Sequence, residues 1–287
     1  MTELLAVLAA TAGAVSAACS PPGGASPKME WSMPPEGKQS IATASKLRVL
    51  FAHQSVGANI LDGLRHLLEE AGTTWPIIDL DAAKGQSAPG IIDTRPGKNG
   101  SPKTKIDGFE AALDSLQGNP PQLALMKFCY ADFARDTDVP DLFDYYKHAI
   151  ARIKARHPAV IIAHATAPLR IREQGLKTRI KRILGMRPES DLLNAKREQF
   201  NRLLRTEFAN EPIFDIARVE STDLAGTRET YPIDGHPTPA LVAAYSSDGG
   251  HLTPLGMRVL ASAYARFVAA AGTAGASTKD TPSVQQN

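Results

Sequence analysis

The stretch "YSSDGGHLTPLG", residues 245–256, holds an acid and a histidine at a spacing that could do chemistry. Asp248 and His251 are three residues apart, with two glycines between them. On a tight turn, the carboxylate of Asp248 can accept a hydrogen bond from one ring N–H of His251, which leaves the other ring nitrogen to act as a base. This spacing predicts the orienting half of a nucleophilic triad. A capped loop with an incidental histidine explains the spacing alone equally well.

A serine in "LRVLFAHQSVGANILDGL", residues 47–64, is a candidate nucleophile. The apolar run from Leu47 to Ala52 predicts a buried strand, and apolar residues at helical spacing after Gly57 predict a helix. Ser55 therefore lies between a strand end and a helix start, where backbone N–H groups are unpaired and the helix dipole is positive. Serines at such positions more commonly cap the helix, so the segment alone favours a cap.

Strand-like and helix-like segments alternate between Lys46 and Ala271. Such alternation predicts a parallel sheet with helices on both faces, a flavodoxin-like three-layer α/β/α sandwich with a five-stranded sheet. The predicted strands are 47–52, 75–80, 122–130, 159–165 and 212–216. The predicted helices are 59–71, 106–117, 140–156, 189–209 and 254–270.

The order of the two motifs resembles the SGNH (GDSL-like) hydrolase superfamily. A serine after the first strand and a D-x-x-H block before the last helix are the features that carry the resemblance, with His-Gln-Ser in place of the usual Gly-Asp-Ser. The resemblance covers most of residues 46–271. It implies a serine esterase in which Ser55 attacks the acyl carbon, His251 accepts the proton and Asp248 orients His251, with no metal or organic cofactor.

The resemblance also implies an oxyanion hole built by two further blocks. The segment "RPGKNGSPKTKID" offers Gly97 or Gly100 as the backbone donor. The second block normally supplies an asparagine, but here the chain reads Cys-Tyr-Ala-Asp at residues 129–132. We therefore expect the missing side-chain donor to be Asn99, Lys127 or Tyr130.

Other function classes find little support in the sequence. The net charge of +2 gives no reason to expect nucleic acid as a partner. No glycine-rich phosphate loop follows the first strand, and no H-E-x-x-H occurs, which disfavours nucleotide and metal sites. The expected substrate is an O-acyl ester of a carbohydrate or another small ester. Acyl transfer by the same triad, and a non-catalytic binding protein of the cell surface, remain alternatives.

The N-terminal residues predict export. Residues 1–19 form an apolar leader whose small residues before Cys19 are similar to the lipobox of bacterial lipoproteins. Residues 20–45 have the Pro/Gly/Ser composition of a flexible linker, and residues 272–287 that of a disordered tail. We expect a periplasmic or cell-envelope protein with a membrane tether through Cys19.

Three further features are open to more than one interpretation. His164 ends the fourth predicted strand and is expected to be structural rather than a substrate contact. Cys129 is expected to be a buried thiol. Residues 170–187 hold seven basic residues and one acidic residue, which indicates a solvated surface, a lid, or attraction to anionic glycans or lipid headgroups.

Overall fold

The computed structural model describes residues 31–279, and the side chains of residues 31–274. Its elements follow the predicted alternation of strands and helices. In chain order they are α1 (Pro35–Ala44), β1 (Arg48–Ala52), α2 (Ser55–Ala71), β2 (Ile77–Asp79), α3 (Leu80–Ala83), β3 (Gly90–Thr94), α4 (Pro102–Asp114), β4 (Leu123–Met126), η1 (Tyr130–Asp132), α5 (Val139–Arg156), β5 (Ile161–Ala165), α6 (Leu176–Ile183), α7 (Glu189–Glu207), β6 (Ile213–Phe214), α8 (Ile216–Glu220), β7 (Thr230–Ile233), β8 (His236–Pro239), η2 (Ala243–Tyr245) and α9 (Pro254–Lys279).

The main sheet has six parallel strands in the order β2-β3-β1-β4-β5-β6. β1 is central, because it pairs with β3 on one side and with β4 on the other. The residues that follow these three strands therefore meet at one edge of the sheet. In open parallel sheets that edge, beyond the carboxyl ends of the strands, is where sites are built.

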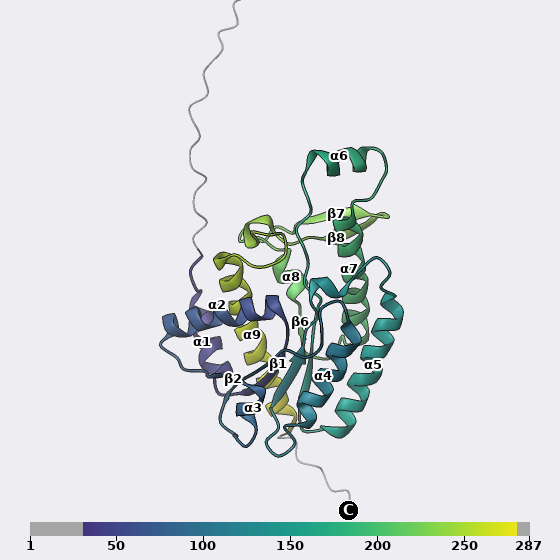
Figure 1. Ribbon diagram of the computed structural model, residues 1–287. Coiled ribbons are helices and arrows are strands. Elements are labelled where there is room, and N and C mark those ends of the chain that lie inside the picture. The colour runs from purple at the N-terminus through teal and green to yellow at the C-terminus, as the bar shows by residue number, and fades with distance from the viewer. Residues whose placement is uncertain (1–30, 280–287) are drawn as a thin grey trace, which may run out of the picture. The chain divides into compact units, whose positions relative to one another are not determined.

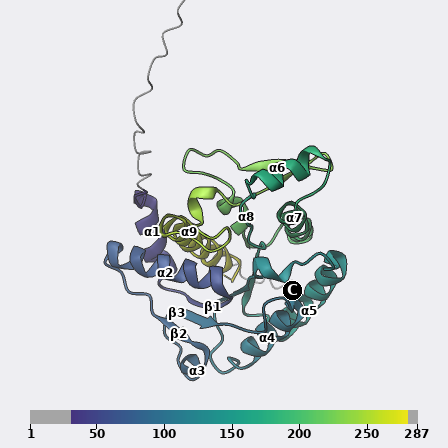
Figure 2. The same ribbon diagram turned by 45° about the horizontal axis from the view of Figure 1, so that its top comes forward.

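Helices cover both faces of the sheet, as predicted (Figures 1 and 2). On one face, α2 and α9 pack against each other and α1 packs on α9, around a core that includes Phe51, Leu64 and Tyr264. On the other face, α4, α5 and α7 enclose a second core around Phe128 and Phe200. Every residue of β1 is buried, as expected of a strand covered on both faces.

The prediction of five strands is wrong by one. β3 lies between β1 and β2, where the five-strand order would place the two in contact. Its sequence, Gly-Ile-Ile-Asp-Thr, has only two aliphatic residues, so it gives little strand signal. The extra strand has a consequence for the site: the loop of residues 95–101 follows β3 and lies directly beside the end of β1.

The predicted linker and tail are wrong where the structure describes them. Residues 35–44 form α1, and its Ile41 is buried against the core. The final helix continues to Lys279, eight residues into the predicted tail. Residues 1–30, with the predicted leader and Cys19, and residues 280–287 lie outside the described residues. Between residues 31 and 279, no helix combines the length and apolar character needed to cross a bilayer.

Candidate active site

The "HQSVG" segment turns the chain from β1 into α2 above a buried histidine. His53 is 1% exposed, and its Nε2 lies 2.9 Å from Oδ1 of Asp93 on β3. Burial alone would raise the pKa of Asp93, but the contact with His53 lowers it overall. A Cβ on Gly57 would stand 2.3 Å from the His53 ring, so only glycine lets α2 begin this close to the strand. His53 and Gly57 thus fix where Ser55 sits.

Ser55 is the first residue of α2, and the capping alternative is wrong. The N-cap is Gln54, and no side chain caps this helix. The hydroxyl Oγ of Ser55 instead lies 3.6 Å from Sγ of Cys129, beyond the end of β4. Within the described residues, the backbone N–H of Ser55 has no acceptor. Ser55 therefore combines a hydroxyl that contacts only the thiol of Cys129, among the described residues, with a free N–H at the positive end of a helix.

The predicted acid–histidine pair is formed. Nδ1 of His251 lies 2.5 Å from Oδ2 of Asp248, while Oδ1 accepts the backbone N–H groups of His251 and Gly250, at 2.7 and 2.9 Å. These hydrogen bonds, the one from the His251 ring first, hold the pKa of Asp248 well below its usual range. The carboxylate is an acceptor only, so Nδ1 carries the proton and Nε2 is left to accept one.

Tyr130 packs against the imidazole of His251. Its hydroxyl lies 3.3 Å from Nε2 and 3.4 Å from Nδ1, and the two rings meet edge to face. A Cβ on Gly250 would stand 2.7 Å from the Tyr130 ring, which explains the second glycine of the "DGGH" turn. Burial, helped by the negative charge of Asp248, raises the pKa of Tyr130, so the hydroxyl keeps its proton at neutral pH.

Two arginines, of which Arg197 is buried, hold the Tyr130 turn in place. Nε and Nη2 of Arg197 both donate to the carbonyl of Tyr130, at 3.1 and 2.8 Å, and Arg197 is 1% exposed. The guanidinium of Arg170 lies 5.4 Å from the Tyr130 ring centre and donates to the carbonyl of Gly249. These contacts connect η1 to the turn that carries His251.

Ser55 and His251 come from segments that the fold brings together. Asn59, one turn into α2, accepts the backbone N–H of Leu252 at 3.1 Å, which ties the Ser55 helix to the residue after His251. Cys129 touches Ser55 and the next residue, Tyr130, touches His251. No direct hydrogen bond joins Ser55 to His251 in the described part of the chain. Catalytic hydrogen bonds are often long before substrate binds.

The two glycines of the loop after β3 that were predicted as oxyanion donors differ in whether their backbone N–H is free. The N–H of Gly100 is occupied by Oδ1 of Asp132, at 2.9 Å, so Gly100 is not free to donate. The carbonyl of Gly97 accepts a 3.4 Å hydrogen bond from Gln54, the neighbour of Ser55. The N–H of Gly97 has no acceptor within residues 31–279. Gly97 therefore remains a candidate donor, whereas Gly100 is used to fix the loop.

The predicted side-chain donors differ in accessibility. Oδ1 of Asn99 accepts from Lys105 at 2.8 Å, and the exposed side chain still has its amide N–H groups to donate. Lys127 is 1% exposed and donates to the carbonyl of Phe128, and burial lowers its pKa to about 8. Lys127 thus lies beneath the site. Tyr130 is the predicted donor that directly contacts a triad candidate.

A buried ion pair that the sequence did not indicate supports both loops. Nζ of Lys105 lies 2.6 Å from Oδ2 of Asp132, and the two side chains are at most 2% exposed. Asp132 also accepts the N–H of Cys129 at 2.6 Å and that of Gly100 at 2.9 Å. This one carboxylate therefore connects the loop after β3 to the turn that holds Cys129 and Tyr130.

His164 does not belong to the site. Its Nδ1 lies 2.8 Å from the hydroxyl of Tyr146, its Nε2 lies 2.8 Å from Glu211, and its ring stacks on Phe208. Burial lowers the pKa of His164 to about 4, so the ring is neutral at physiological pH. The expected structural role fits these contacts.

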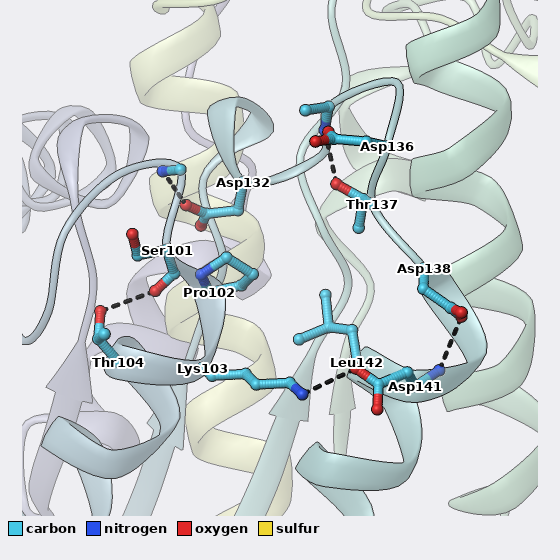
Figure 3. A pocket seen from close by; sticks show the side chains of 12 residues that line it. Ser101, Pro102, Lys103, Thr104, Asp132, Asp136, Thr137, Asp138, Asp141 and Leu142 are labelled. Atoms are coloured by element: carbon cyan, nitrogen blue, oxygen red, sulfur yellow. Dashed lines mark hydrogen bonds and ion pairs between the residues drawn. The ribbon is translucent and has the colours of Figure 1, made fainter.

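A cavity of about 360 Å³ lies between the starts of α4 and α5 (Figure 3). Asp132 lines it, but Ser55 and His251 do not. Its other polar groups are largely paired with one another: Lys103 with Asp141, and the side chain of Asp138 with the N–H of Asp141. The cavity therefore borders Asp132 but does not open on the candidate triad residues.

Across residues 31–279, no three His, Cys, Asp or Glu side chains are grouped to hold a metal ion.

Comparison with known proteins gives distant structural likenesses. No protein-family model and no curated protein matches the chain. A lipase/acylhydrolase from Enterococcus faecalis is 13% identical, with a TM-score of 0.47 over 78% of this chain and 96% of that one. A family 3 carbohydrate esterase from Clostridium thermocellum is 13% identical, with a TM-score of 0.43 over 79% and 98%. The periplasmic domain of a Salmonella Paratyphi A lipopolysaccharide acetyltransferase is 16% identical, with a TM-score of 0.42 over 77% and 84%.

Proposed function

We propose that the protein is a serine esterase of the SGNH type that hydrolyses an acyl ester of a carbohydrate or another small ester. The observation that carries the proposal is the short contact between Asp248 and His251, beside the helix that begins with Ser55. Ser55 has a backbone N–H without an acceptor in the described residues, and its hydroxyl does not cap α2. Both features support the role of nucleophile.

In the proposed reaction, Oγ of Ser55 attacks the acyl carbon and Nε2 of His251 takes its proton. The tetrahedral intermediate then expels the alcohol, which receives that proton, and the acyl group stays on Ser55. A water molecule attacks the acyl-serine, and His251 again moves the proton. The products are the free carboxylic acid and Ser55 with its proton restored. Asp248 fixes the tautomer of His251 and stabilises its cation.

Two backbone N–H groups are proposed to bind the oxyanion, those of Ser55 and Gly97. Both are without an acceptor in the described residues, and Gln54 holds Gly97 next to Ser55. Tyr130 is proposed to supply the side-chain donor, because Ala131 stands where the superfamily has asparagine. One such donor is typically worth about 10²–10³-fold in turnover.

Hydrolysis is favoured over acyl transfer by the exposure of the site. The side chains of His251 and Asp248 are 43% and 53% exposed, so water reaches the base. The test is turnover of p-nitrophenyl acetate, and of acetylated glycans, by the protein and its S55A variant. We expect acetate release that S55A abolishes. Transfer of acetyl to an added sugar in preference to water would instead support the transferase alternative.

Export and tethering through Cys19 form a separate proposal, supported by the leader sequence alone. Its test is mass spectrometry of the N-terminus of protein made in a bacterial host. An acylated Cys19 is the expected result. An unmodified Met1 on cytoplasmic protein would contradict it.

A further inference from the structure

Helix α6 turns its apolar side outward. Five of the six exposed large hydrophobic side chains in the described part of the chain lie in or just after it: Leu176, Ile180, Ile183, Leu184 and Met186, at 75%, 47%, 81%, 66% and 51% exposed. Figure 1 shows α6 projecting beyond the β7–β8 hairpin. Soluble proteins rarely leave such a contiguous patch without a partner.

The spacing of these residues defines a single stripe. Successive helical residues are about 100° apart, so Leu176, Ile180, Ile183 and Leu184 share one side of the helix. The polar Thr178 and Arg182 lie on the opposite side and are the least exposed residues of α6. A surface helix usually packs its apolar side on the core, so the orientation of α6 is the reverse of the usual one.

Ion pairs hold α6 in this orientation. Arg182 donates twice to Asp191 of α7, both at 2.9 Å. Arg187, after the helix, pairs with Asp234 at the tip of the β7–β8 hairpin. The polar side is thus anchored to the body of the protein, and the apolar stripe faces away from it.

The charges that flank the stripe identify the partner. Lys177, Arg179 and Lys181 are exposed and form no ion pair with any described residue, and α6 contains no acidic residue. Long cationic side chains beside an apolar stripe can reach anionic lipid headgroups. The aliphatic side chains of the stripe can then enter the boundary between the headgroups and the acyl chains. Anionic lipids attract such residues when they lie near the membrane surface.

We propose that α6, with Leu184 and Met186, is a docking surface for a membrane that contains anionic lipid. The surface lies close to the candidate site along the chain: the N–H of Ile171 donates to the carbonyl of Gly249, and Leu176 follows Ile171 by only five residues. A chain of that length spans at most about 18 Å. Docking would therefore hold the Asp248–His251 turn close to the lipid surface. The proposal does not depend on catalysis.

The test is flotation of the full chain with phosphatidylcholine vesicles, with and without phosphatidylglycerol. All proteins carry C19A, so that a lipid anchor is absent and the leader is common to every sample. We expect binding to the anionic vesicles that falls by at least about tenfold in the I180S/I183S variant. K177Q/R179Q/K181Q should reduce binding by about a hundredfold at low salt. The matched control is L224S, which removes an exposed leucine elsewhere and should change binding less than twofold.

A second measurement follows insertion directly. The I183W variant should show a blue shift of tryptophan emission with anionic vesicles and none with phosphatidylcholine alone. Circular dichroism checks that each variant is folded. Equal binding to both vesicle types, or equal loss in L224S and I180S/I183S, would overturn the proposal. Self-association that I180S/I183S abolishes, without vesicle binding, would instead identify a second copy of the chain as the partner.

Discussion

The hydroxyl of Tyr130 lies 3.3 Å from Nε2 of His251, the ring nitrogen that Asp248 leaves uncommitted. Tyr130 comes from the turn after β4, and His251 from the turn before α9. Two segments that are 121 residues apart thus meet at the proposed base. The backbone of Tyr130 is fixed by Arg197, so its hydroxyl is held in place before substrate binds.

The Y130F variant tests the role of this hydroxyl. If it stabilises the oxyanion and positions His251, kcat should fall by about 10²-fold while KM changes little. Steady-state kinetics with p-nitrophenyl acetate measures both constants. Y145F is the control, since the hydroxyl of Tyr145 binds Asp107 on the exposed side of α4 and α5. An unchanged kcat in Y130F would remove Tyr130 from the site.

Replacement of Asp248 by asparagine tests the orientation of the histidine. An amide can donate to Nδ1 and so favour the wrong tautomer, and we expect kcat to fall by about 10³–10⁴-fold. The low pKa of Asp248 keeps the carboxylate ionised at acid pH. The wild-type pH–rate profile should therefore show no step in the usual pKa range of aspartate. Such a step would contradict this assignment.

The Lys105–Asp132 pair should matter for stability. Removing one partner of a buried ion pair leaves a charge without compensation, which typically costs about 3–5 kcal/mol. We expect K105M to lower the free energy of unfolding by about that amount in urea titrations. K103M, which removes an exposed partner of Asp141, should lower it by less than about 1 kcal/mol. Equal effects of the two variants would show that the buried pair has no special role.

Glu220 should make stability depend on pH. Burial raises its pKa to about 8, and its Oε1 has no partner in the described residues. The folded state therefore holds a proton that the unfolded state releases above its lower, ordinary pKa. This favourable contribution is complete at acid pH and is lost as pH rises toward 8.

The E220Q variant keeps a neutral side chain at every pH, so its stability relative to wild type should increase between pH 5 and pH 8 by more than about 1 kcal/mol. Urea unfolding at the two values measures the difference. Lys127, whose pKa burial lowers to about 8, begins to lose its proton only near the upper end of this window, and it does so in both proteins. A constant difference between E220Q and wild type would contradict the assignment.

The sequence located the candidate triad residues because their signals are local. Ser55 follows an apolar strand, and Asp248 and His251 lie within one turn. The contacts of Cys129 with Ser55 and of Tyr130 with His251 could not be predicted in the same way, since they depend on β4 lying next to β1. α1 did leave a signal: Pro35 stands at the first position of its helix, where proline is favoured.

The sequence could not reveal which way α6 faces. Its basic residues and its aliphatic spacing are visible in residues 176–184, and such a pattern ordinarily predicts that the aliphatic side packs on the core. The ion pair of Arg182 with Asp191 reverses that orientation, and Asp191 belongs to another helix. β3 was missed because Asp93 interrupts its apolar run. The reason for an aspartate there is its contact with His53, a residue distant in the sequence.

Fluorophosphonate labelling with peptide mapping tests the central claim most directly, because the reagent reacts only with an activated serine. We predict a single adduct on Ser55 in the folded wild-type protein. The adduct should be absent from S55A, and H251A should lose most of it while remaining folded. No adduct on the folded protein, or an adduct on another serine that H251A leaves unchanged, would contradict the proposal that Ser55 and His251 form a catalytic pair.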